Sequence, residues 1–179
     1  MKPTLLFILL PLTLLFSTQT MAREQAVAID YLNGSDDIEG IRLAYRPLTH
    51  DLTTSWFGDI KLYWEVSANF WEYGEQNTHS SNYAVAISPV IVKHLTTIAD
   101  KYPIYLEAGI GASLVDDRTF AGKDIGSHYQ FEDRIGFIFS LDQKERHQVS
   151  VRYMHYSNAG LSDDNPGLDF LTLSYIRHF

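Results

Sequence analysis

The chain has 179 residues, a formal net charge of −8 at pH 7 and no cysteine. The acidic balance argues against nucleic acid as a partner, because phosphate backbones attract basic surfaces. The lack of cysteine excludes disulfides as a source of stability. Residues 1–22 predict a cleaved signal peptide, since Lys2 precedes an apolar run from Leu5 to Phe16 and small residues follow at Thr20 and Ala22. The expected mature domain is therefore 23–179.

The mature region alternates between apolar and polar side chains, in segments separated by stretches rich in Gly, Asp, Asn, Ser and Thr. Such alternation, bounded by turn-forming residues, predicts β-strands. No apolar run after residue 22 is long enough to cross a bilayer as a helix. In chain order, the predicted strands are 24–33, 40–47, 57–70, 82–93, 102–115, 128–140, 147–157 and 169–179.

The two rows of each predicted strand differ in a way that favours a membrane. One row is apolar, as in Ile104, Leu106 and Ala108. The other row carries charges of both signs, which suit the crowded lumen of a small barrel whose apolar row faces lipid. These charges are Lys61, Glu65, Glu107, Glu132, Arg134 and Arg152. The sequence therefore predicts an all-β fold, an eight-stranded antiparallel transmembrane β-barrel of the bacterial outer membrane.

Two further features agree with this fold. The final predicted strand ends in Phe179, which resembles the assembly signal of bacterial outer-membrane barrels. The segments 71–81 and 115–127 are long and polar, as expected of extracellular loops, whereas 141–146 suits a periplasmic turn. The segment 94–101 is longer than such a turn should be. We expect Trp56, Trp64 and Trp71 in the aromatic girdles at the membrane boundaries.

A serine, a histidine and a carboxylate come together near the last predicted hairpin. His155 and Ser157 are two residues apart, so they lie on one face of a strand, about 6–7 Å apart along the backbone. An antiparallel return through residues 158–168 brings Asp169 beside His155. A serine hydroxyl becomes a nucleophile when a histidine takes its proton and a carboxylate orients that histidine. These residues therefore predict a Ser-His-Asp triad.

Strand parity places this triad on the outer wall of the barrel. His155 and Ser157 continue the apolar row of Val151 and Tyr153, and Asp169 begins the apolar row of the last strand. Polar groups on a lipid-facing wall are costly and are usually functional. They make sense if the substrate is itself a lipid of the outer leaflet, which in this membrane is chiefly lipopolysaccharide.

The same residues carry a family resemblance. The sequence His-x-Ser-Asn-Ala-Gly at 155–160, followed by Asn-x-Gly-x-acid at 165–169, resembles the lipid A 3-O-deacylase (PagL) family, and Phe131-Glu132-Asp133 is similar to a family element on the preceding strand. The resemblance implies an outer-membrane barrel that removes the 3-linked acyl chain of lipid A without a cofactor or metal. It is dense over about 25 residues.

The resemblance also implies a role for each residue. Ser157 is the nucleophile, His155 the general base and Asp169 the orienting acid, where the family typically has glutamate. Asp163 and Asp164 are nearby alternatives for the acid. The supporting residues around the oxyanion hole are Asn158, Gly160, Asn165 and Asp133.

Two other functions compete with this interpretation. An outer-membrane phospholipase shares the lipid-facing serine and histidine but generally depends on calcium and dimerisation. The acidic run 162–165 could bind calcium, although a solvated loop is the better interpretation. A structural or adhesive barrel gives no reason for the three triad residues to share one end. The oligomeric state is left open, a homodimer included; the predicted partners are the bilayer and lipid A.

Overall fold

The computed structural model describes residues 25–35, 37–74 and 80–179, so the expected signal peptide lies outside the described residues. Over these ranges no helix is long and apolar enough to cross a membrane. The described residues form ten strands: β1 (Ala26–Gly34), β2 (Ile38–Thr54), β3 (Gly58–Tyr73), β4 (Ser80–Ile98), β5 (Tyr102–Val115), β6 (Thr119–Phe120), β7 (Lys123–Asp124), β8 (Tyr129–Ser140), β9 (His147–Ser157) and β10 (Leu168–His178).

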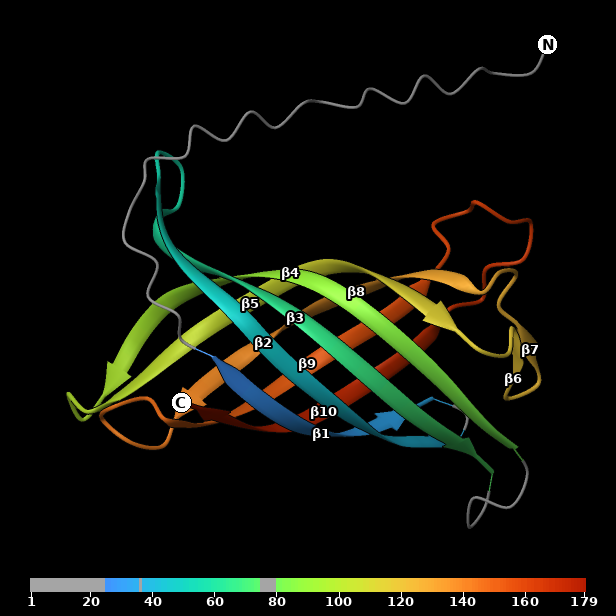
Figure 1. The fold of residues 1–179 in the computed structure, drawn as a ribbon, viewed down its shortest axis with the longest axis horizontal. Helices are drawn as coiled ribbons and strands as arrows, with labels where there is room; N and C mark the ends of the chain where they lie inside the picture. Colours follow the sequence, from blue (N-terminus) through green and yellow to red (C-terminus); the bar gives the residue numbers. More distant parts are fainter. Residues whose placement is uncertain (1–24, 36, 75–79) are drawn as a thin grey trace.

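Eight of these strands close into one antiparallel barrel in the order β1-β10-β9-β8-β5-β4-β3-β2 (Figure 1). All eight predicted strands are present, and the predicted fold class is confirmed. The strands β6 and β7 form a small separate hairpin within the segment that links β5 to β8. The barrel leaves no open sheet edge, which is what a β-structure in lipid requires.

Two strands, β2 and β4, run well beyond their predicted ends. β2 continues to Thr54 through a register shift between Tyr45 and Leu48, and β4 continues to Ile98 through a second shift after His94. Such bulges let Pro47, which has no N–H to donate, stay within a paired strand. The turn from β4 to β5 is therefore short, and the long turn expected at 94–101 does not occur.

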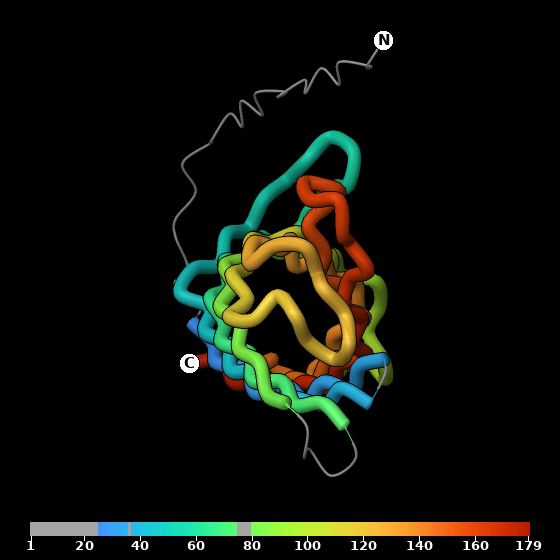
Figure 2. Tube along the Cα trace, turned by 90° about the vertical axis from the view of Figure 1, so that its right-hand side faces the viewer, coloured from blue at the N-terminus to red at the C-terminus, as the bar shows by residue number. Residues whose placement is uncertain are grey.

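The two ends of the barrel differ. One end, called here the turn end, carries the turns 55–57, 99–101 and 141–146. The start of β1 and the end of β10 meet at this end, where Phe179 N–H donates to Gln25 O at 3.0 Å. The opposite end, called here the loop end, carries the segments 116–128 and 158–167. Figure 2 looks onto the loop end, where the segment 116–128 crosses the mouth of the barrel.

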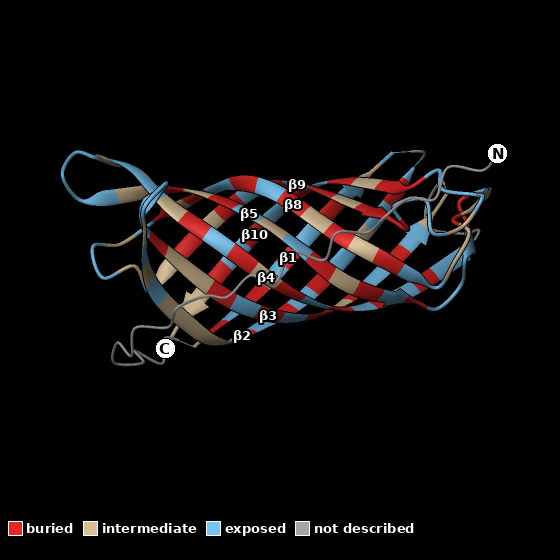
Figure 3. Ribbon diagram, turned by 90° about the horizontal axis from the view of Figure 1, so that it is seen from above, coloured by how far each residue is buried: buried red, intermediate tan, exposed pale blue. Residues whose placement is uncertain are grey.

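The lumen is filled by charged side chains. Buried and exposed residues alternate along the strands (Figure 3), as strand geometry requires. Glu65 accepts hydrogen bonds from Arg42 at 2.5 Å, Arg46 at 2.8 Å and Arg134 at 2.5 Å, and all four side chains are buried. Buried charges persist only when they are paired in this way.

Apolar clusters close both ends of the charged layer. The cluster near the turn end includes Tyr63, Tyr105 and Ile176, and the cluster at the loop end includes Tyr156, Phe170 and Trp71. The expectation that Trp71 belongs to a membrane girdle is wrong, because this indole is fully buried and stacks on Phe170 with ring centroids 5.2 Å apart. Trp71 occupies the lumen row of β3, and its size fills the mouth of the barrel. Trp64, by contrast, lies on the outer wall.

We expect Glu65→Gln to lower the free energy of unfolding by about 3 kcal/mol, because three buried guanidinium groups lose their shared counter-charge. Urea unfolding in detergent micelles measures the change. Glu72→Gln, which removes an exposed carboxylate from the same strand, is the control and should unfold like the wild type. Equal midpoints for the two variants would contradict a stabilising charge network.

Candidate active site

The structure brings His155 and Asp169 into direct contact. Their residues are opposite each other in the register of β9 and β10, and Nδ1 of His155 lies 2.6 Å from Oδ1 of Asp169. Both side chains are partly exposed on the outer wall, at the loop end. A hydrogen bond at Nδ1 fixes the tautomer of the imidazole and leaves Nε2 free to accept a proton.

Ser157 is the last residue of β9, on the same outer row as His155. Only 8% of its surface is exposed. Among the described residues, Ser157 Oγ makes no hydrogen bond with His155. Ser157 and His155 therefore share one face of the strand without being hydrogen-bonded to each other, and contacts of this kind commonly tighten when substrate binds.

Asp133 lies on the other side of His155. It is opposite His155 in the register of β8 and β9, just as Asp169 is opposite His155 in the register of β9 and β10. His155 is thus flanked by one carboxylate on each neighbouring strand, but the hydrogen bond goes to Asp169 alone. The geometry therefore distinguishes Asp169, which is hydrogen-bonded to His155, from Asp133, which is not.

Asn158 organises the loop that comes after Ser157. Its Nδ2 donates to Ile125 O at 3.0 Å and to Asp164 O at 2.7 Å, and its Oδ1 accepts from Gly160 N at 2.9 Å. Its backbone N–H donates to Oδ1 of Asn165 at 2.9 Å. Because Asn158 is fully buried and its donors are all engaged, it acts as the internal anchor of the loop.

Two glycines allow close packing around this anchor. Gly126 has a φ of +80°, and a Cβ atom there would lie 2.0 Å from Asp164 O, so the segment before β8 packs directly on the 158–167 loop. Gly167 has a φ of +69°, and a Cβ atom there would lie 2.7 Å from Cε1 of His155. The backbone at Gly167 therefore forms one wall of the space that holds the imidazole.

The sequence alone did not predict one direct contact of Asp169. Tyr153 OH donates to Oδ1 of Asp169 at 2.5 Å, the same oxygen that His155 contacts. The alternation of the strand assigns Tyr153 only to the apolar row that faces lipid. The available signal was its spacing, since Tyr153 precedes His155 by two residues on the same face.

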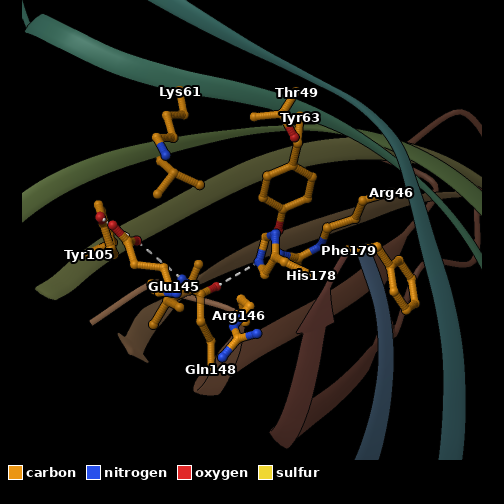
Figure 4. Close-up of a pocket in the computed structure, with 13 residues that line it drawn as sticks. Arg46, Thr49, Lys61, Tyr63, Tyr105, Glu145, Arg146, Gln148, His178 and Phe179 are labelled. Carbon is orange, nitrogen blue, oxygen red and sulfur yellow. Dashed lines mark hydrogen bonds between the residues drawn. The ribbon is translucent and has the colours of Figure 1, made fainter. Parts of the chain in front are cut away.

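A separate hollow of about 180 Å³ lies at the turn end (Figure 4). It holds none of the predicted site residues. Its lining side chains bond to one another, as Tyr105 OH donates to Glu145 at 2.6 Å and Nε2 of His178 lies 3.0 Å from Gln148 Oε1. The candidate active site is therefore the outer wall at the loop end.

The fold and the site together define a membrane β-barrel that carries a hydrolase-type set of side chains on its outer wall. The family model for lipid A 3-O-deacylase (PagL) matches residues 39–177. The chain belongs to this family, whose name denotes hydrolysis of an ester.

Similarity to individual proteins supports this family membership. The chain is 33% identical to lipid A deacylase PagL of Bordetella bronchiseptica, covering 91% of this chain and 88% of the relative. It is 32% identical to lipid A deacylase PagL of Pseudomonas aeruginosa, covering 93% and 96%. The crystal structure of the outer membrane enzyme PagL superposes with a TM-score of 0.66 at 26% identity, covering 85% of this chain and 98% of that one. The barrel is thus an outer-membrane protein.

We expect Gly167→Ala to lower kcat by about 10- to 100-fold, because the added methyl group displaces the ring of His155 from its working position. Gly122→Ala is the matched control, since Gly122 has a similar φ of +72° but open space around it. Fatty-acid release from detergent-solubilised lipid A measures both. Equal activity of the two variants, with both barrels folded, would show that the imidazole is not held by residue 167.

Proposed function

We propose that this protein hydrolyses the 3-O-linked acyl ester of lipid A, with Ser157 as nucleophile, His155 as general base and Asp169 as orienting acid. The observation that carries the proposal is the 2.6 Å contact between His155 Nδ1 and Asp169 Oδ1, with Ser157 two residues away on the same wall. The family membership supports the substrate and the position of the ester.

The reaction proceeds through an acyl-enzyme. Ser157 Oγ attacks the ester carbonyl while Nε2 of His155 takes the hydroxyl proton. The tetrahedral adduct then collapses, and His155 returns that proton to the departing sugar hydroxyl. Water attacks the acyl-serine with His155 again as base, which releases the fatty acid and restores Ser157. The balance consumes one ester and one water, and it calls for no cofactor or metal.

Asn165 is the side chain best suited to stabilise the oxyanion. Its Oδ1 is held by the N–H of Asn158 at 2.9 Å, which fixes the plane of the amide. Asn165 is exposed, and its Nδ2 makes no hydrogen bond within the described part of the chain. A donor oriented in advance is what stabilisation of developing charge requires. Asn158 and Gly160 support this donor by fixing the loop.

Asp133 has a supporting part in the same scheme. It faces His155 from β8, opposite to Asp169. A second carboxylate beside the imidazole favours the imidazolium that forms when His155 takes the serine proton. Asp133 thereby lowers the free energy of the charged intermediate without contacting substrate.

The surroundings of the site suit a lipid that arrives from the side. Immediately below the triad, the outer wall carries exposed apolar residues, among them Val151, Leu171 and Leu173. Above it stands the polar loop 158–167. An acyl chain would lie against the apolar wall, while the sugar and phosphate groups of lipid A stay at the level of the loop. In this proposal the loop end lies at the outer face of the membrane.

We expect wild-type protein, refolded in detergent, to remove one 3-hydroxyacyl chain from lipid A and Ser157→Ala to remove none. Mass spectrometry of the lipid A product measures the loss. Ser162→Ala, which removes a hydroxyl from the neighbouring 158–167 loop, is the control and should retain activity.

Other outcomes point to other functions. Intact lipid A together with digested glycerophospholipid, in the same tube, assigns a phospholipase. Intact lipid of both kinds, from barrels shown to be folded, contradicts the proposed enzyme. Activity that survives in Ser157→Ala contradicts the assignment of the nucleophile.

A further inference from the structure

One oxygen of Asp169 carries two hydrogen bonds. Oδ1 contacts His155 Nδ1 at 2.6 Å and accepts from Tyr153 OH at 2.5 Å. The two partners come from the same strand, β9, and Asp169 reaches both from the start of β10. The phenol, the carboxylate and the imidazole therefore form one chain of hydrogen bonds along the outer wall.

A hydrogen bond from Tyr153 matters to Asp169 because the Asp169 carboxylate is partly exposed. Its side chain is 42% exposed, and His155 is 33% exposed. Tyr153 and His155 both hydrogen-bond to its carboxylate. An exposed carboxylate with a single contact can rotate toward water and release the imidazole. A donor from Tyr153 opposes that rotation, because it holds the oxygen that faces His155.

We propose that Tyr153 is a positioning residue of the active site, which holds the Asp169 carboxylate in the orientation that fixes the His155 tautomer. This inference rests on the proposed function of Ser157, His155 and Asp169. Tyr153 does not touch the reacting atoms. Its hydroxyl acts through Asp169, and its ring remains part of the lipid-facing wall, where it is 48% exposed.

A simpler explanation is that Tyr153 merely satisfies its own hydroxyl on an apolar wall. The two explanations predict different effects when the hydroxyl is lost. If Tyr153 only satisfies itself, removing the hydroxyl leaves the His155–Asp169 pair unchanged. If Tyr153 positions Asp169, the same removal changes the rate, the pH dependence and the tautomer of His155.

The direction of the pH effect is set by the charges around the pair. The charged groups that face it are Asp133 from β8 and Lys123 from β7, and neither changes in a Tyr153 variant. Without the phenol, the Asp169 carboxylate loses a hydrogen-bond donor and is protonated more easily, so the charged partner of His155 is lost at a higher pH. This moves the acid limb of kcat/KM to higher pH.

The test compares Tyr153→Phe with Tyr175→Phe. Tyr175 is a matched control, because its hydroxyl also lies on the outer wall and contacts a histidine, His147, at 2.6 Å, but at the turn end. We expect Tyr153→Phe to lower kcat about tenfold, with KM little changed and the acid limb shifted to higher pH. Tyr175→Phe should match the wild type in all three.

A conservative second change tests the positioning role itself. In the Tyr153→Phe background, Asp169→Glu lengthens the acid by one methylene, so the carboxylate can approach His155 without help from a phenol. We expect the double variant to recover most of the lost kcat. A double variant no better than Tyr153→Phe overturns the positioning role, as does a Tyr153→Phe variant that matches Tyr175→Phe in rate and pH profile.

A readout without activity separates this inference from the proposed function. The ¹⁵N shifts of His155 in micelles report its tautomer, and we expect Tyr153→Phe to shift the tautomer balance of the imidazole away from that of the wild type. If wild-type protein releases no acyl chain from lipid A, the proposed function fails, and the His155 tautomer still decides the inference. An unchanged tautomer in Tyr153→Phe overturns it.

Discussion

Closure of the barrel decides, for every residue of every strand, whether its side chain enters the lumen or faces lipid. The side-chain period of a strand is two, and a closed sheet has no edge at which the register can slip without turning a whole row over. The lumen row holds Glu65 and the three arginines that bond to it. A change of register would expose these charges to lipid and break their pairing, at a large cost in free energy. The ionic lumen therefore also fixes which residues reach the outer wall.

The active site depends on this constraint. With the lumen row of β9 fixed, His155 and Ser157 must lie outside, and the register with β10 sets Asp169 beside His155. Serine hydrolases in water bury such residues in a cleft, whereas at the proposed site the bilayer and the 158–167 loop would take the place of that cleft. The loop is anchored inward by Asn158, so the outer wall stays open to a lipid that diffuses in the plane of the membrane.

Periodicity is enough to predict the strand number, the charged lumen and the meeting of His155 with Asp169, because all three depend on local alternation and short hairpins. The prediction for Trp71 is wrong. Trp71 lies on the same row of β3 as Glu65, which indicates the lumen, but the prediction followed the general preference of tryptophan for membrane boundaries instead. The contacts of Gly126 and Gly167 could not be predicted, since they join loops whose path depends on packing between distant segments. The extension of β2 could not be predicted, because the bulge between Tyr45 and Leu48 interrupts the alternation and contains a proline, as a turn would.

The central claim is that a serine on the outer wall of the barrel attacks an ester. A fluorophosphonate with an alkyl tail, added to the folded barrel in micelles, tests it directly, because such probes modify only serines that a neighbouring base activates. We predict one adduct per chain, located at Ser157 by peptide mass spectrometry and absent from His155→Ala. An adduct at another residue, or none on protein that releases fatty acid, would contradict the account.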